Sequence, residues 1–373
     1  MLDTLLITLL AFTYKQLIMI GIGCLLLYLA IEKGFEPNLL LPMGFGTILV
    51  NIPFSSALTQ GATHGALSLL FDMGIANELF PLLIFIAVGA MCDFTPLLAN
   101  PRIFLFGLTA QAGIFLTMGI ALLLGFNIPE AASIGIIGAA DGPTAIFVSN
   151  RFAPHLLGSI SVAAYTYMAL VPLIQPPVIK MLTTKKERAM TMSYEQVSIS
   201  RFKLIAFPVI ITLIAGIVAP ASVSLLGFLM FGNLLRVSGV TERLSLSAQN
   251  ELANIVTILL GFSLAATMTG DKFVHARTLL IIGMGLIAFV LDTAAGVMSA
   301  KFLNLFMPEN RKFNPMVGAA GISAFPMSAR VIQRMGQEAN PHNFLLMNAV
   351  GANVSGQIGS VLAGGLMLAY LGG

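Results

Sequence analysis

Residues 137–145 read IGAADGPTA, and this stretch indicates both the class of protein and its fold. It places one carboxylate, Asp141, inside an apolar run that has no other charged residue between Glu130 and Arg151. A carboxylate buried at that depth is costly unless it is paired or binds a cation. Pro143 lacks the N–H that would continue a helix. The stretch therefore predicts a broken membrane helix with an ion-binding carboxylate, although an Asp that caps a re-entrant helix or pairs with a basic residue would also fit.

The composition around this stretch is that of a polytopic membrane protein. Charged residues make up 9% of the 373 residues, against about 25% in an average soluble domain. Asp, Glu, Lys and Arg are absent from 103–129, 204–235, 252–270 and 339–373. Since a spanning helix needs about 20 apolar residues, the length allows about ten to twelve spans. A soluble enzyme is excluded, and a net charge of +3 gives no reason to expect nucleic acid.

The apolar segments form two sets that suggest an internal repeat. The run GAADGP at 138–143 corresponds to GAAGIS at 318–323 in the second set, and two weaker matches follow the same order. We expect two inverted repeats with discontinuous helices, broken or re-entrant, as in secondary transporters; two similar bundles from an old duplication are the alternative. The repeats are 1–182 and 203–373. The basic linker 183–202 is expected to be cytoplasmic.

The second-half stretch offers neutral oxygen atoms from Asn314, Ser323 and the carbonyls freed by the break. One carboxylate combined with neutral oxygens suits Na⁺ better than Ca²⁺, which prefers more carboxylates. The alternative is that the small residues around Gly318 form a close-packing face and that Asn314 caps a helix.

Four further polar residues interrupt apolar sequence. Arg330 either extends its charge to the membrane surface or receives a carboxylate through its planar guanidinium. Tyr167 and Asn353 take nearly equivalent places in the two sets, and a tyrosine hydroxyl there could donate a proton or bind an ion, although membrane tyrosines are more often interfacial. Asp292 has no break around it, which favours a role in helix–helix hydrogen bonding. The chain has no phosphate-binding motif, so we expect no ATP site.

Five motifs together resemble the β subunit of the biotin-dependent, sodium-translocating decarboxylases that act on oxaloacetate, methylmalonyl-CoA, glutaconyl-CoA or malonate. They are GFG at 44–46, NIP at 51–53, GAADGPTA at 138–145, VPLIQPP at 171–177 and SAR at 328–330. The resemblance covers nearly the whole chain.

The resemblance implies a reaction that composition does not reveal. A separate carboxyltransferase subunit would load biotin on a carrier protein, and the carboxybiotin, which is not covalently bound to this chain, would dock on its cytoplasmic side. Its decarboxylation would consume a proton and drive Na⁺ export across the inner cell membrane. A small membrane subunit and a multi-copy assembly are also implied. The alternative is a stand-alone Na⁺-coupled carboxylate transporter or Na⁺/H⁺ antiporter of similar fold.

The resemblance also implies roles for individual residues. Those expected to bind Na⁺ are Asp141, Asn314, Gly318, Ser323, Tyr167 and Asn353. Those expected in catalysis are Arg330, Tyr167 and Ser323, with Arg330 also binding the carboxybiotin. Oxaloacetate subunits carry a long polar insertion where this chain has only the short segment 54–78, which favours a methylmalonyl-CoA or glutaconyl-CoA complex.

Overall fold

The computed structural model describes residues 7–8, 10–61, 63–192 and 198–371. Over those ranges the chain is helical and contains no strand, apart from an isolated bridge between Gln60 and Thr63. The helices up to the linker are α2 (Tyr14–Glu32), α3 (Pro37–Val50), α4 (Ala66–Phe71), α5 (Leu79–Met91), α6 (Thr95–Ala99), α7 (Phe104–Ala110), α8 (Ala112–Leu123), α9 (Ile128–Gly135), α10 (Gly142–Phe152), α11 (Leu157–Ala169), α12 (Val171–Leu182) and α13 (Lys185–Arg188).

The helices after the linker are α14 (Arg201–Val218), α15 (Val223–Val237), α16 (Glu242–Ser247), α17 (Ala253–Ala265), α18 (Gly270–Phe273), α19 (Ala276–Asn304), α20 (Pro315–Ala319), α21 (Met327–Ala339) and α22 (Leu346–Leu371). Short 3₁₀ or π turns are η1 (Asp72–Ala76), η2 (Pro101–Ile103), η3 (Ile136–Ala139), η4 (Pro154–Leu156), η5 (Pro220–Ser222), η6 (Ala248–Leu252) and η7 (Glu309–Arg311).

Among the described residues, six helices are long and apolar enough to cross a membrane, or up to eight if each of two bent pairs counts as one span. The six are Tyr14–Glu32, Pro101–Leu123, Arg201–Val218, Pro220–Val237, Ala276–Asn304 and Leu346–Leu371. The pair Pro154–Ala169 and Val171–Leu182 bends by 70°. The count is lower than the one expected from length, because several apolar segments are divided into helices too short to span. The fold is that of a multi-pass helical membrane protein.

Both predicted helix breaks are present. In the first half, η3 ends at Ala139, Ala140 adopts a left-handed φ of 53°, and α10 begins at Gly142. In the second half, α20 ends at Ala319 and α21 begins only at Met327. We call residues 139–140 the first break and residues 319–326 the second break, each counted from the last residue of the preceding helical turn.

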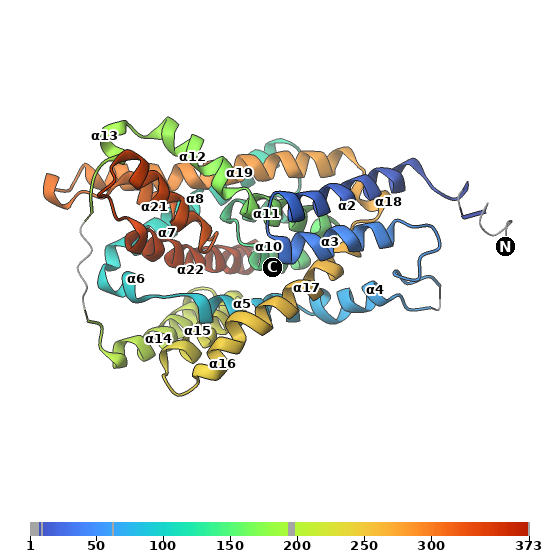
Figure 1. Cartoon of the computed structure of the whole chain (residues 1–373), viewed down its shortest axis with the longest axis horizontal. Helices are drawn as coiled ribbons and strands as arrows, with labels where there is room; N and C mark the ends of the chain where they lie inside the picture. Colours follow the sequence, from blue (N-terminus) through green and yellow to red (C-terminus); the bar gives the residue numbers. More distant parts are fainter. Residues whose placement is uncertain (1–6, 9, 62, 193–197, 372–373) are drawn as a thin grey trace.

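Helices from the two halves pack against each other rather than forming separate bundles. Extensive contacts join α5 with α15, α3 with α17, and α7 with α22. Figure 1 shows α19 running along one long side of the molecule, and α22 reaches the central helix α10, which it contacts. Because α19 also packs against α8, η3 and α20, it contacts the elements that precede both breaks.

Candidate functional site

Asp141 is buried directly after the first break, where it is the N-cap residue of α10. Its Oδ2 atom accepts hydrogen bonds from the hydroxyls of Thr144 (2.7 Å) and Ser360 (2.8 Å). An Asp followed by a proline in the first turn is a favourable start for a helix. Asp141 makes no ion pair with any residue that the structure describes. Its charge therefore has neutral partners only.

A cavity of about 160 Å³ adjoins this carboxylate, and we call it the Asp141 cavity. Its polar lining residues are Glu36, Asp141, Tyr165, Thr257, Ser323 and Gln357. The Tyr165 hydroxyl is buried and has no hydrogen-bond partner among the described residues. The Tyr165 ring packs so closely on Gly142 that a Cβ atom there would lie 2.2 Å from it. No lysine, arginine or histidine is among the described lining residues, so the cavity combines two carboxyl groups with neutral oxygens.

The carbonyl groups of the second break are hydrogen-bonded by side-chain amides. Every carbonyl from 319 to 323 accepts such a bond. The pairs are Gln175 with Ala319 (2.9 Å), Asn353 with Ala320 (3.2 Å) and Ile322 (2.6 Å), Gln111 with Gly321 (3.2 Å), and Gln357 with Ser323. Unwound backbone inside a membrane protein requires such partners. These carbonyls, expected as ion ligands, are thus already engaged in this conformation.

One face of α22 contacts both breaks. Asn353, Gln357 and Ser360 are spaced so that they share that face. Asn353 and Gln357 bond to the second break, and Ser360 bonds to Asp141 beside the first. The Ser323 hydroxyl donates to the Gly356 carbonyl of the same helix at 2.8 Å. Sequence reasoning missed Ser360, although its helical spacing from Asn353 and Gln357 in a charge-free segment was a usable signal.

Four of the expected Na⁺ ligands, Asn314, Gly318, Tyr167 and Asn353, do not line the Asp141 cavity. Asn314 caps α20 by accepting from the Met316 N–H (3.0 Å) and donates to the carbonyl of Met190 in the linker (2.8 Å). Gly318 packs against α19, where a Cβ atom on it would lie 2.0 Å from the Gly296 carbonyl oxygen. Their contacts in this structure are those of a helix cap and a close-packing residue.

Of the two neighbouring tyrosines, Tyr165 lines the Asp141 cavity and Tyr167 does not. The Tyr167 hydroxyl donates to the Ile282 carbonyl of α19 at 2.5 Å. Successive helix positions are about 100° apart, so residues 165 and 167 face different neighbours. Asn353, also expected at the site, has a buried side-chain oxygen without a partner among the described residues.

Arg330 is exposed on α21 and lines a second cavity of about 430 Å³, the Arg330 cavity. Lys33 and Arg334 line it too, together with Glu36. Arg330 forms no ion pair with any of the residues described. Three basic side chains around one hollow provide a setting for an anionic group, and a guanidinium can bind a carboxylate through two parallel hydrogen bonds.

Asp292 is fully buried in α19 and faces the approach to the first break. A Cβ atom on Gly138 would lie 2.5 Å from its Oδ2, and one on Gly113 would lie 2.0 Å from its Oδ1. Asp292 therefore packs between the beginning of α8 and the turn η3, outside the lining of both cavities.

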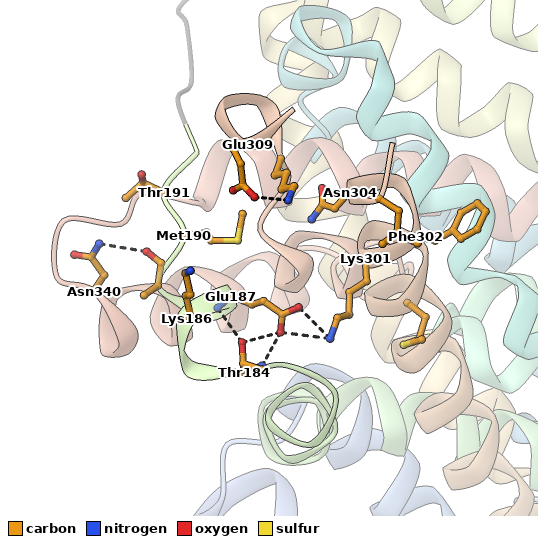
Figure 2. A pocket seen from close by; sticks show the side chains of 14 residues that line it. Thr184, Lys186, Glu187, Met190, Thr191, Lys301, Phe302, Asn304, Glu309 and Asn340 are labelled. Carbon is orange, nitrogen blue, oxygen red and sulfur yellow. Dashed lines mark hydrogen bonds and ion pairs between the residues drawn. The ribbon is translucent and has the colours of Figure 1, made fainter. Parts of the chain in front are cut away.

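A larger hollow of about 880 Å³ lies where the linker meets α19 (Figure 2). Within it, Glu187 forms an ion pair with Lys301 at 3.0 Å and accepts from the Thr184 hydroxyl at 3.0 Å. Partial burial opposes ionisation of Glu187, but the hydrogen bonds from Thr184 and Lys301 outweigh it and hold its pKa below the usual range. These contacts fix the start of the linker to the end of α19.

Comparison with known proteins places the chain among membrane subunits of decarboxylases. Residues 15–371 match the family described as the Na⁺-transporting oxaloacetate decarboxylase beta subunit. The methylmalonyl-CoA decarboxylase subunit beta of Veillonella parvula is 52% identical over 362 residues, covering 97% of this chain and 95% of the relative. The glutaconyl-CoA decarboxylase subunit beta of Acidaminococcus fermentans is 50% identical over 363 residues, with the same coverage.

The oxaloacetate decarboxylase beta chain of Klebsiella pneumoniae is 46% identical over 414 residues, covering 95% of each chain. Identity of this extent over almost the full length of several relatives is decisive for the family. The chain belongs to the family of β subunits of Na⁺-transporting decarboxylases.

Proposed function

We propose that this chain is the membrane subunit of a sodium pump that decarboxylates carboxybiotin presented on a carrier protein, consumes a proton and exports Na⁺. The observation that carries the proposal is the buried Asp141 carboxylate, which accepts only from two hydroxyls and the backbone N–H of Thr144 and faces a cavity with no basic side chain among its described lining residues. A buried carboxylate needs a compensating cation or proton. The pump supplies each of them in turn.

Na⁺ would be bound as cargo by Asp141 and by neutral oxygens around it. Ser323 and Tyr165 line the same cavity and supply the hydroxyls that a hard cation accepts as ligands. Asn353 would act by holding the second break. The roles expected for Asn314, Gly318 and Tyr167 stay predictions, since their contacts lie elsewhere.

Carboxybiotin would bind as substrate in the Arg330 cavity. The Arg330 guanidinium has the planar shape that orients a carboxylate, and Lys33 and Arg334 add positive charge nearby. Holding the carboxylate would position the bond to be cleaved. Loss of CO₂ leaves an electron pair on the biotin nitrogen, which then takes up a proton.

The inverted-repeat relation between the halves is part of the proposal and is supported by a reciprocal pair of contacts. Asn51, the C-cap residue of α3, donates to the Met268 carbonyl, just after α17, at 2.8 Å. Asn233 of α15 donates to the Cys92 carbonyl, just after α5, at 3.0 Å. Each asparagine thus binds the end of a helix from the other half, with 1–182 and 203–373 as the repeats.

We further propose an acyl-CoA complex, fed by methylmalonyl-CoA or glutaconyl-CoA decarboxylation, rather than an oxaloacetate complex. The lengths of the alignments support this assignment, because those with the Veillonella and Acidaminococcus proteins span 362 and 363 residues and that with the Klebsiella chain spans 414. Such a complex would include a carboxyltransferase subunit, a biotin carrier and a small membrane subunit. It would lie in the inner cell membrane in several copies.

The test uses the complete complex in proteoliposomes. Carboxylated carrier is added, and uptake of radioactive Na⁺ is measured in the wild type, in Asp141→Asn and in the control Asp271→Asn, whose side chain is 91% exposed. We expect uptake in the wild type and control and none in Asp141→Asn. Full uptake in Asp141→Asn would contradict the proposal. Uptake by this chain alone, without carrier, would favour the stand-alone transporter.

A further inference from the structure

Glu36 is the one described residue that lines both the Asp141 cavity and the Arg330 cavity. Elsewhere between the two cavities, residues that are close in sequence line different cavities. In α11, Met168 lines the first cavity and Ala169 the second. At the end of the second break, Phe325 lines the first and Met327 the second. The two cavities therefore adjoin at Glu36.

The backbone of Glu36 is fixed while its side chain is free. Glu36 is the N-cap residue of α3 and adopts a left-handed φ of 37°, which is uncommon for a residue other than glycine. Its carbonyl accepts from the N–H groups of Leu39 (3.0 Å) and Leu40 (2.9 Å). Its carboxylate forms no hydrogen bond or ion pair with any residue in the described part of the chain. Such a group is held in place and remains available to a mobile partner.

The two cavities differ in charge on either side of Glu36. Asp141 and Tyr165 are the other titratable groups of the Asp141 cavity. Lys33, Arg330 and Arg334 are the charged groups of the Arg330 cavity. Burial raises the pKa of Glu36, which brings its proton affinity closer to that needed for proton transfer near neutral pH.

We propose that Glu36 is the proton donor to the biotin nitrogen and that it is reprotonated from the Asp141 cavity. This inference rests on the proposed function, since it assigns a residue to the proton that decarboxylation consumes. The proton path would run through Glu36, in the loop between α2 and α3. Sequence reasoning did not select this residue.

The chemical step balances with the species already named. The carbon–nitrogen bond of carboxybiotin breaks, CO₂ leaves, and the bonding electron pair stays on the nitrogen. The carboxylic acid of Glu36 transfers its proton to that nitrogen, which yields neutral biotin and the Glu36 carboxylate. A proton from the Asp141 cavity then restores the acid, so one proton is consumed per CO₂ released.

The test measures decarboxylation of pre-carboxylated carrier by the complete complex, apart from Na⁺ transport. Glu36→Gln keeps the side-chain shape and removes the transferable proton. Glu32→Gln, one turn earlier at the exposed end of α2 and outside both cavity linings, is the matched control. We expect Glu36→Gln to slow decarboxylation by about 100-fold and to flatten its pH–rate profile.

Glu36→Asp keeps a carboxylic acid one methylene shorter and should recover part of the rate, with a displaced pH–rate profile. If Glu36→Gln does not assemble, Glu36→Asp decides the matter: an unaltered rate and profile would overturn the proposal. So would a wild-type rate and profile in Glu36→Gln, or a loss confined to Na⁺ affinity. Failure of the sodium-pump proposal is distinguishable, because it would appear as absence of Na⁺ uptake in the wild-type complex.

Discussion

The backbone N–H of Ser323 donates a hydrogen bond to the carbonyl of Ala139 over 2.9 Å, and this single contact joins the two helix breaks. Asp141 lies two residues beyond Ala139, so its carboxylate and the second break are linked through the main chain. A shift of either break is communicated to the other. Sequence matching paired the two stretches as repeats but gave no reason to expect a direct bond between them.

Ser360→Ala should weaken Na⁺ binding. The variant removes one of two hydroxyls that bind the Asp141 carboxylate. The net value of such a bond is about 1 kcal/mol, or about a fivefold change in affinity. The measurement is the Na⁺ concentration at half-maximal transport. Ser263→Ala is the control, because that buried serine bonds only to a carbonyl of its own helix. An unchanged half-maximal concentration in Ser360→Ala would show that this hydroxyl is not part of the site.

Tyr165→Phe and Tyr167→Phe should have different effects. Removing the unpartnered Tyr165 hydroxyl from the Asp141 cavity should lower Na⁺ affinity, by about fivefold for a ligand worth ~1 kcal/mol. Removing the Tyr167 hydroxyl breaks its bond to Ile282, so we expect about 1 kcal/mol lower stability and nearly normal Na⁺ affinity. Na⁺ titration and thermal unfolding of the two variants separate the effects. The reverse result would restore Tyr167 as the ligand that the family resemblance implies.

Gly318→Ala should destabilise the fold. The added methyl group would lie 2.0 Å from the Gly296 carbonyl oxygen, so α20 and α19 would have to separate. Overpacking of this kind costs about 1–3 kcal/mol, which thermal unfolding of the purified complex would detect. Gly283→Ala is the control within α19, because nothing lies within 4 Å of a Cβ atom there. Equal melting temperatures for both variants would argue against close packing at Gly318.

The contacts of Glu187 that hold the linker to α19 should persist at neutral pH and weaken only in acid. A carboxyl with a lowered pKa contributes stability that is complete above its ordinary value of about 4.3 and disappears as the pH falls through its lower value in the folded chain. The protection of the amides of residues 184–190 against hydrogen exchange, relative to the intrinsic rate at each pH, should therefore be high at neutral pH and fall in acid. Glu187→Gln should have low protection at every pH, whereas Glu338→Gln, which changes an exposed acid on α21, should match the wild type.

The sequence predicted the parts of this molecule that depend on local chemistry. A carboxylate among glycines and a proline in apolar sequence indicated the break at Asp141, and the matching stretch indicated the second break. The direction in which each helical side chain faces could not be predicted in this way. The prediction named Tyr167, whereas Tyr165 lines the Asp141 cavity. Ser360 escaped notice because its partner, Asp141, lies 219 residues away along the chain. Asn314 could be identified as a possible cap, but its bond to the linker depends on tertiary packing.

The five hydrogen-bonded carbonyls of the second break limit how the transporter can change shape. Their amide partners come from α12, α22 and the turn between α7 and α8. Pulling the second break away from these helices would break five hydrogen bonds to buried carbonyls, at a cost on the order of 5 kcal/mol. A local gate that opens by unwinding this loop is therefore unfavourable. Alternating exposure of the ion is better served by a movement in which the second break stays with the helices that bond to it, α12 and α22.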